Sequence, residues 1–307
     1  MGSKKLLWTT GMAIALGVAG CRMFSGEDAR QYCIIDLSSG PQGKSYPVSF
    51  SSSMPQDDEA KLTKLVLKRI PAGTFKMCGV ADVTISKPFY IGVYHVTRRQ
   101  YQLVEGKRVV AIDSGAYTEI YDKHPALYVS YEKLRGRNLG SKWPASSEVD
   151  EDSFIGKLRA RTGVFGLDLP TEAQFEYACR AGTTNLYHNG GDTAADLNKI
   201  ACYAGNPVKN GEVGSYQPNN WGLYDMQGSA YQWCLDWGPW KITQSTDPKG
   251  NPTGRTRCLR GGCFLYRADE CTSKFRYYDC GTPANESAYF SFRLCCPADV
   301  LESACED

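Results

Sequence analysis

Cysteine is the residue type through which this sequence could do the most chemistry. The chain of 307 residues has 13 cysteines and only three histidines. Thiolates bind soft metals such as copper(I) and act as redox groups. No two cysteines stand in a CxxC spacing, which argues against a zinc ribbon or a thioredoxin-type site. GxSxG, P-loop and HExxH motifs are also absent, so the thiols carry the main chemical interest.

The cysteine count also predicts crosslinks. If Cys21 is modified, an even number remains, and an even number in an exported chain favours disulfides. Most of these cysteines lie in the C-terminal half. The adjacent pair Cys295 and Cys296 would point to opposite faces of a strand, so we expect them to have different neighbours.

The elements that must position these groups are short and mixed in type. Strands are expected over 64–70, after the Pro-Ala-Gly turn, and in 83–96 with a break at Lys87-Pro88. Helices are expected over 98–105 after a Thr97 cap, over 154–161, and after the capping box of Thr171 and Gln174. Short strands and turns then continue to Cys296. This pattern predicts one loop-rich α+β domain over 62–297.

The N-terminus has the features of an export signal. Lys4 and Lys5 precede an apolar run that is too short to span a bilayer. We expect residues 1–20 to be a signal peptide whose lipobox ends at Cys21, the lipidation site. That assignment predicts a lipid-anchored protein of the cell envelope. Residues 21–61 read as a tether with little core of its own, in which 32–35 (YCII) could form a short strand. Residues 298–307 read as an acidic, solvated tail.

Composition limits the partners. Apolar residues are 42% and charged residues 22% of the chain, as in ordinary globular proteins. Removal of residues 1–20 leaves 33 basic and 33 acidic side chains, so the mature chain has no net charge with which to attract nucleic acid.

Six segments, read in order, resemble the sulfatase-modifying factor family, whose founding member is the formylglycine-generating enzyme. They are 70–79 (IPAGTFKMCG), 87–104 (KPFYIGVYHVTRRQYQLV), 169–184 (LPTEAQFEYACRAGTT), 219–237 (NNWGLYDMQGSAYQWCLDW), 257–264 (RCLRGGCF) and 291–296 (SFRLCC). The resemblance implies a C-type-lectin-like α+β fold with few regular elements. It also implies the chemistry of a copper-dependent oxidase that converts a sulfatase cysteine to formylglycine.

The catalytic pair that the resemblance implies is incomplete here. Its second cysteine corresponds to Cys271, but its first corresponds to Tyr266, and a phenol is a poor ligand for copper(I). Cys263 lies three positions before Tyr266, and on a strand this odd spacing would point it to the other face. We therefore do not expect bound copper. The resemblance further suggests a disulfide between Cys234 and Cys271, with other pairings left open.

The resemblance also implies a calcium site. Its ligands would be the side chain of Asp225, the carbonyls of Gly228 and Ala230, and the side chain of Gln232. The family has a glutamate where this chain has Gln232, so one charge is lost and calcium affinity should fall.

The C-terminal stretch has the composition of a binding surface, with rigid aromatic and adaptable polar side chains. Its members are Tyr266, Arg267, Asp269, Phe275, Tyr277, Tyr278 and Tyr289. Some lectin-like proteins of the family are diversified in this stretch by retroelements, and core packing of these aromatics is the simpler alternative. Three functions follow: a binding or scaffold protein for a protein or glycan ligand, an atypical oxidase acting on a sulfatase peptide through Cys271, or a diversified lectin-like binder.

Overall fold

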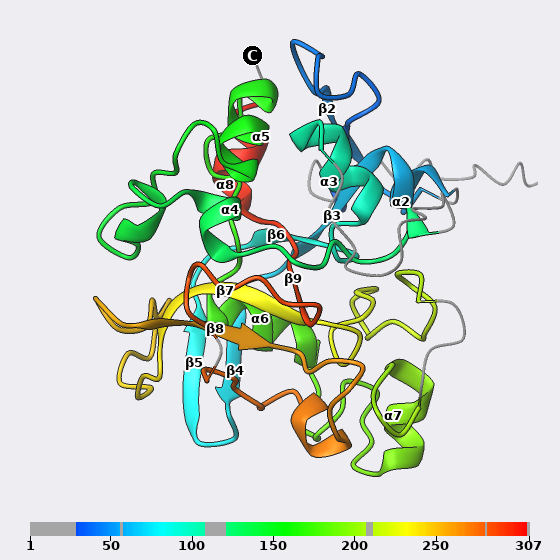
Figure 1. Cartoon of the computed structure of the whole chain (residues 1–307). Helices are drawn as coiled ribbons and strands as arrows, with labels where there is room; N and C mark the ends of the chain where they lie inside the picture. Colours follow the sequence, from blue (N-terminus) through cyan, green and yellow to red (C-terminus); the bar gives the residue numbers. More distant parts are fainter. Residues whose placement is uncertain (1–28, 56–57, 108–120, 207–210, 280, 306–307) are drawn as a thin grey trace, which may run out of the picture.

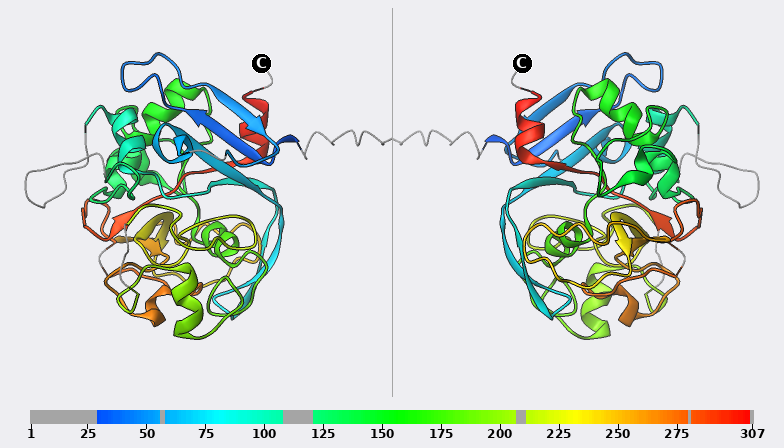
Figure 2. Two further views of the ribbon diagram at one scale, coloured as in Figure 1. Left: turned by 90° about the vertical axis from the view of Figure 1, so that its right-hand side faces the viewer. Right: turned by 90° about the vertical axis from the view of Figure 1, so that its left-hand side faces the viewer.

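The computed structural model describes residues 29–55, 58–107, 121–206, 211–279 and 281–305. In Figure 1 the larger sheet and helices α2, α3, α5 and α8 form the upper part of the molecule, and the smaller sheets with α6 and α7 form the lower part. The side views in Figure 2 show the β4–β5 hairpin extending from the upper part along one edge of the lower part. The expected signal peptide over 1–20 and the expected lipidation site Cys21 lie outside the described residues.

The larger sheet has five strands in the order β10-β6-β3-β1-β2, with every pairing antiparallel. The strands are β1 (Tyr32–Asp36), β2 (Val48–Ser51), β3 (Lys64–Ile70), β6 (Phe89–Gly92) and β10 (Cys295–Pro297). All four residues of β6 are buried because β6 has strands on both sides and structure on both faces. The strands predicted in 64–70 and 83–96 are confirmed.

The prediction of a tether over 21–61 is wrong for its described part. β1 lies between β3 and β2 in the sheet, and β2 forms its edge. Cys33, Ile35, Leu37 and Tyr46 are buried in the main hydrophobic core. The alternation of buried and half-buried residues along β1 is that of a sheet strand. The short strand that the sequence allows at 32–35 is confirmed as β1, but its place within the sheet was not expected.

The prediction of a solvated tail over 298–307 is also wrong. Residues Ala298–Ser303 form helix α8, which buries Ala298 and Leu301. Glu302 accepts hydrogen bonds from Arg69 at 2.9 Å and from Tyr90 at 3.0 Å. The acidic residues of this segment therefore anchor it to the sheet. Glu302 binds side chains of β3 and β6, and Asp299 forms an ion pair with Lys87.

The helices begin where the capping signals predict. Thr97 caps α3 (Arg98–Glu105) and Thr171 caps α6 (Glu172–Arg180), each with a complete capping box. Ser153 caps α5 (Phe154–Thr162), which ends at Gly163 with a positive φ. Ser130 caps the short α4 (Tyr131–Arg135). Two further short elements are α2 (Glu59–Leu62) and the 3-10 turn η2 (Gly140–Lys142).

The lower part carries the segments of chemical interest. Its sheets are the hairpin of β4 (Gly73–Met77) with β5 (Ala81–Ile85), and a three-stranded sheet in the order β8-β7-β9. The latter strands are β7 (Tyr231–Gly238), β8 (Thr256–Arg260) and β9 (Phe290–Ser291). The part also holds α7 (Ala194–Ile200) and the 3-10 turn η3 (Ala268–Cys271). The sequence analysis missed α7, although Thr193 and Asp196 form a capping box there.

The α+β class is confirmed by this mixture of short helices and small sheets. No helix in the described ranges combines the length and the apolar character needed to cross a membrane.

Candidate functional site

The centre of the candidate site is the turn that follows β8. Gly261 and Gly262 both have positive φ angles, +97° and +81°. A Cβ atom on Gly262 would lie 2.6 Å from the sulfur of Cys271. The glycine is therefore required both by its backbone conformation and by the close approach of that sulfur. This turn sets Cys263 beside Cys271.

The expectation that Cys263 faces away from Tyr266 was based on strand geometry, which this segment does not have. Residues 263–266 form a turn in which the Tyr266 N–H donates to the Cys263 carbonyl at 3.2 Å. The thiol of Cys271 interacts with Cys263, and more weakly with Cys202. Because the backbone reverses here, the alternation rule for strands does not apply.

Both thiols are buried and protonated. Burial, with the neighbouring Cys263 thiol, raises the pKa of Cys271 to about 12. Burial likewise raises the pKa of Cys263 to about 11. The thiolate is the form that attacks electrophiles and binds metal. At neutral pH neither sulfur is in that form.

Tyr266 is the residue that the resemblance aligns with the first cysteine of the pair. Its ring lies 5.6 Å from that of Tyr231, 6.1 Å from Tyr277 and 6.2 Å from Tyr289. Phe264 joins the cluster through Tyr289 at 5.8 Å. We call the half-buried rings of Phe264, Tyr266, Tyr277 and Tyr289 the aromatic face. The neighbouring Leu265 is 55% exposed, so the surface here is apolar and accessible.

The structure divides the predicted binding surface. Tyr266, Tyr277 and Tyr289 lie together in the aromatic face. Arg267 and Asp269 are exposed and pair with each other at 3.5 Å. Tyr278 packs elsewhere, against a second hydrophobic cluster, where its hydroxyl is 3.3 Å from Glu172. Phe275 packs against the main core. Core packing, the simpler alternative, describes Phe275 and Tyr278. Tyr266, Tyr277 and Tyr289 also pack against the main core, with part of each ring left exposed.

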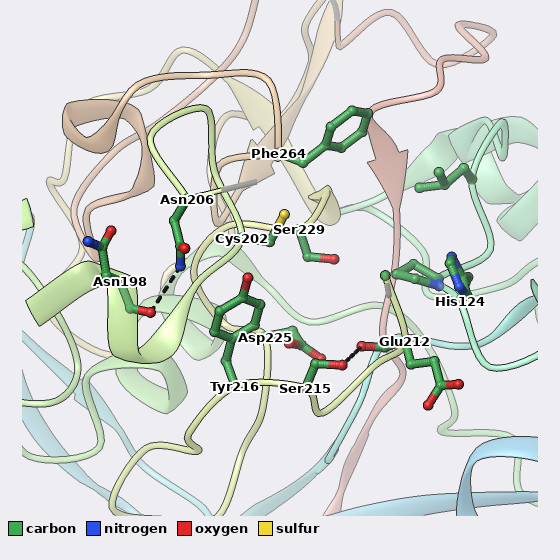
Figure 3. A pocket seen from close by; sticks show the side chains of 13 residues that line it. His124, Asn198, Cys202, Asn206, Glu212, Ser215, Tyr216, Asp225, Ser229 and Phe264 are labelled. Carbon is green, nitrogen blue, oxygen red and sulfur yellow. Dashed lines mark hydrogen bonds between the residues drawn. The ribbon is translucent and has the colours of Figure 1, made fainter. Parts of the chain in front are cut away.

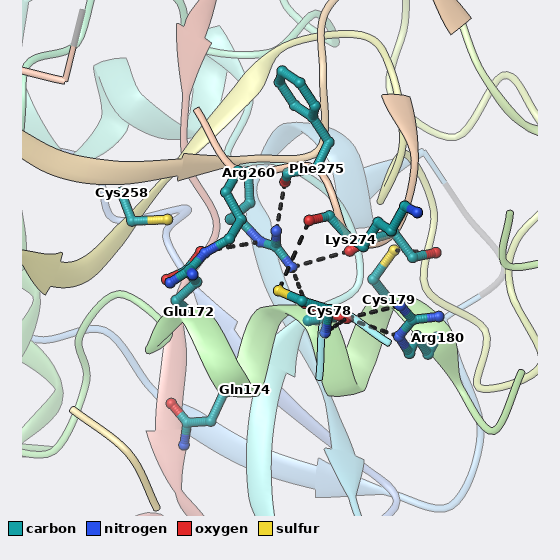
Figure 4. A network of polar contacts seen from close by, with 12 residues as sticks. Cys78, Glu172, Gln174, Cys179, Arg180, Cys258, Arg260, Lys274 and Phe275 are labelled. Atoms are coloured by element: carbon teal, nitrogen blue, oxygen red, sulfur yellow. Dashed lines mark hydrogen bonds and ion pairs between the residues drawn. The ribbon is translucent and has the colours of Figure 1, made fainter. Parts of the chain in front are cut away.

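Below these aromatics lies a buried network of charges (Figure 4). Glu172 accepts hydrogen bonds from Arg276 Nε at 2.6 Å and from Trp240 Nε1 at 2.6 Å. Arg260 reaches both Glu172 and Glu176. Burial alone would raise the pKa of Glu172, but the hydrogen bonds from Arg276 and the charge of Arg260 outweigh it and hold that pKa below its usual value. The network holds β8 and the loop after it against α6.

The two side chains expected to bind calcium, those of Asp225 and Gln232, have hydrogen-bond partners within the protein. The Gln232 side-chain oxygen accepts from Arg293 Nε at 2.5 Å, and its amide nitrogen donates to the Asp225 carbonyl at 3.1 Å. Burial lowers the pKa of Arg293 only to about 10, so this guanidinium remains charged at neutral pH. A calcium ion at Gln232 would stand beside a buried cation. The Asp225 carboxylate itself accepts from the Gly214 N–H instead.

The disulfide expected between Cys234 and Cys271 is wrong. Both are free thiols, and they belong to different hydrophobic clusters. Cys234 lies on β7 and interacts with Cys258 on β8, the neighbouring strand. All eleven cysteines of the described ranges are free, and nine are buried. Buried thiols act as small apolar core residues, so the cysteine count alone could not reveal their state. Cys295 and Cys296 do lie in different clusters, as expected for a strand.

A cavity of about 650 Å³ opens beside the Gly261-Gly262 turn (Figure 3). It is lined by five separate segments of the chain, including Asp225, Ser229 and Phe264. Cys202 also lines it and interacts with Cys271 behind the wall. The sequence analysis singled out Asp225 only as a calcium ligand. It missed His124, Glu212 and Tyr216, because no spacing links these positions before the chain folds.

The comparisons with known proteins agree with this architecture. Residues 51–296 match the sulfatase-modifying factor enzyme 1-like domain. The chain belongs to the sulfatase-modifying factor family. A formylglycine-generating enzyme of Thermomonospora curvata is 28% identical over 82% of this chain and 99% of its own length. The family resemblance is thereby confirmed.

Solved structures with this fold superpose on most of the chain. Treponema denticola variable protein 1 superposes with a TM-score of 0.60 and 26% identity, covering 76% of this chain and 96% of its own. PvdO from Pseudomonas aeruginosa superposes with a TM-score of 0.59 and 22% identity, over 76% and 94% of the two chains. This family member therefore has the lectin-like α+β fold that the resemblance implied.

Proposed function

We propose that this member of the family is an exported, lipid-anchored protein of the cell envelope that binds a protein or glycan ligand and does not oxidise sulfatase cysteines. One observation carries the proposal. The position of the first catalytic cysteine holds the ring of Tyr266, packed among Tyr231, Tyr277 and Tyr289. Copper(I) needs two soft ligands in thiolate form, and a phenol is not one.

The state of the second cysteine supports the same proposal. Cys271 is fully buried, and its pKa is raised to about 12. At pH 7 this thiol is protonated, so copper would have to displace its proton in order to bind. The aromatic face then offers a contact surface in place of a reactive group. Half-exposed aromatic rings supply much contact area at a low cost in conformational entropy.

One observation favours the oxidase alternative. The Cys271 thiol interacts electrostatically with Cys263, so a second cysteine lies in its surroundings. In that alternative a sulfatase peptide would be the substrate and Cys271 the essential thiol. The diversified lectin-like alternative draws its support from Treponema denticola variable protein 1, a structural relative that is named a variable protein.

An aldehyde assay tests the proposal. The mature chain is co-expressed with a peptide that carries the sulfatase-type cysteine, copper is supplied, and formylglycine is sought by mass spectrometry. The Thermomonospora curvata enzyme serves as the positive control. We expect no aldehyde from the folded chain. Aldehyde that forms with the wild type and disappears in both Cys271→Ser and Cys263→Ser would refute the binding role and establish the atypical oxidase.

A second measurement tests the contact face directly. A glycan array is probed with the labelled wild type and with Tyr289→Ala and Asp82→Asn, the latter an exposed control far from the face in sequence. Selective binding that Tyr289→Ala removes and Asp82→Asn retains would support a glycan ligand. Binding that both variants retain would exclude the aromatic face as the contact.

A further inference from the structure

A second cavity, of about 670 Å³, lies between the end of β5, the segment that leads into α6 and the start of α8. None of the four residues of the aromatic face lines it. Phe89, Leu169 and Leu235 are buried side chains of its walls, and Phe165 at the same cavity is 72% exposed. A concave site with apolar walls and an exposed aromatic ring is suited to a ligand with an apolar body.

Two guanidinium groups share one carboxylate at this cavity. Asp168 lines the cavity and is buried, and it accepts from Arg135 Nε at 2.7 Å and from Arg159 Nη2 at 3.2 Å. The Leu169 N–H also donates to Asp168, at 2.8 Å. Within the described ranges neither arginine forms an ion pair with a second acid. One buried positive charge therefore remains in excess, which is unfavourable unless an anion reaches it.

Arg159 is the member of this cluster that lines the cavity, and it is 8% exposed. Its Nε donates to the Leu167 carbonyl at 2.8 Å and its Nη1 to the Ser147 carbonyl at 3.0 Å. With the bond to Asp168, these contacts use three of the five N–H groups of the guanidinium. The other two have no acceptor in the described part of the chain, so they are available to a ligand.

Two further donors belong to the same cavity. The indole Nε1 of Trp143 is buried and has no hydrogen-bond partner. A buried N–H without an acceptor costs free energy that a ligand oxygen would recover. The Lys249 ammonium lies 5.6 Å from the centre of the Trp143 ring, and no acid of the described residues pairs with it. Both groups favour a ligand that carries an acceptor and a negative charge.

The two other acids of the lining do not offset this charge. Asp299 pairs with Lys87 at 2.8 Å. Asp247 accepts from the Ser86 N–H at 2.9 Å. Both carboxylates belong to exposed residues, where water and salt screen their charge, whereas Arg159 is buried.

We propose that this cavity binds a monocarboxylate with an apolar chain, the chemistry of a medium-chain fatty acid. The carboxylate would accept from Arg159 and from Trp143 Nε1, and the chain would pack against Leu169 and Phe165. A carboxylate supplies several acceptors and the missing negative charge together, whereas phosphate would leave the apolar walls unfilled. This inference goes beyond the proposed function, because the cavity and the aromatic face have separate residues and either can fail alone.

Matched small probes test the proposal in the full mature chain. Binding of octanoate, octanamide and inorganic phosphate is measured by titration calorimetry at pH 7. Octanamide has the same chain as octanoate but no charge, and phosphate has the charge but no chain. We expect octanoate to bind at least tenfold more tightly than either control. Equal affinity for octanoate and octanamide, or for octanoate and phosphate, would overturn the proposal.

Variants locate the binding. Arg159→Gln removes the buried charge and should weaken octanoate at least tenfold while octanamide changes less than threefold, a split that a general loss of structure would not produce. Arg137→Gln removes the same charge at an exposed site and should leave both affinities unchanged within twofold. Unchanged octanoate affinity in Arg159→Gln, with its fold verified by tryptophan fluorescence, would also overturn the proposal.

A measurement on the wild type covers the case in which Arg159→Gln fails to fold. An octanoate analogue with a diazirine on its chain is photolysed with the protein, and the labelled peptides are found by mass spectrometry. The label should lie in the segments that line the cavity, among them 165–171 and 295–300, and excess octanoate should suppress it. Label confined to other segments, or label that octanoate does not suppress, would show that the cavity does not take the carboxylate.

Discussion

Replacement of Asp236 by asparagine should stabilise the protein at alkaline pH and should do so in a pH-dependent manner. Asp236 is fully buried on β7. Its Oδ2 accepts from the Glu172 N–H at 2.6 Å, and its Oδ1 has no partner. Burial, and next the nearby Glu172 carboxylate, raises the pKa of Asp236 from 3.8 to about 7. The folded state therefore holds a proton that the unfolded state has already released.

The sign and size of the effect follow from that difference. Between about pH 4 and pH 7 the folded state binds more protons, so this group makes the free energy of unfolding fall as pH rises. A gap of about three pKa units, at about 1.4 kcal/mol each, sets an upper bound of about 4 kcal/mol. Asparagine cannot ionise and keeps the acceptor for the Glu172 N–H. We expect Asp236→Asn to exceed the wild type by about 1–4 kcal/mol at pH 8.

Urea unfolding at pH 4.5, 6, 7 and 8, followed by tryptophan fluorescence, measures the difference in the free energy of unfolding between Asp236→Asn and the wild type. His95 and His188 have pKa values lowered by burial, so they titrate in both proteins and cancel in the difference. The advantage of the variant should be within about 1 kcal/mol of zero at pH 4.5 and grow toward pH 8. A difference that does not change with pH would refute the idea that Asp236 is protonated in the folded state at mildly acidic pH.

Three further predictions concern the buried residues around the candidate site. Glu172→Gln removes the carboxylate that pairs with Arg276 and one of the two that pair with the buried Arg260. It should cost about 3–5 kcal/mol by urea unfolding, against less than about 1 kcal/mol for the exposed control Asp82→Asn. Equal losses of unfolding free energy in Glu172→Gln and Asp82→Asn would contradict the stabilising role of the buried charge network. Gly262→Ala should destabilise more than Gly163→Ala by about 1–3 kcal/mol, since both have positive φ but only Gly262 lies against the Cys271 sulfur. Equal destabilisation by Gly262→Ala and Gly163→Ala would show that the contact with the Cys271 sulfur is unimportant. Iodoacetamide in denaturant without reductant should label Cys234 and Cys271 completely, and a crosslinked peptide pair would contradict the free thiols.

Local signals were enough to predict most regular elements. The Thr97 and Thr171 capping boxes located α3 and α6, because a cap is an interaction between residues three apart in sequence. The strands β3 and β6 were likewise visible as apolar runs bounded by proline and glycine. β1 was not assigned to the core because its burial depends on β3, more than thirty residues later. The acidic composition of α8 similarly hid its contacts with Arg69 and Tyr90.

The sequence by itself determined the family, because the family motifs depend only on which residues follow one another. Six segments in order identified the domain, and Tyr266 at a cysteine position weakened the oxidase hypothesis. Tertiary structure alone decided which groups meet. It brought Cys263 beside Cys271 through a turn, separated Cys271 from Cys234, and moved Tyr278 away from the aromatic face. It also assembled Asp225, Glu212 and Phe264 into one cavity. Such contacts join residues tens of positions apart, and no local pattern encodes the approach of two distant loops.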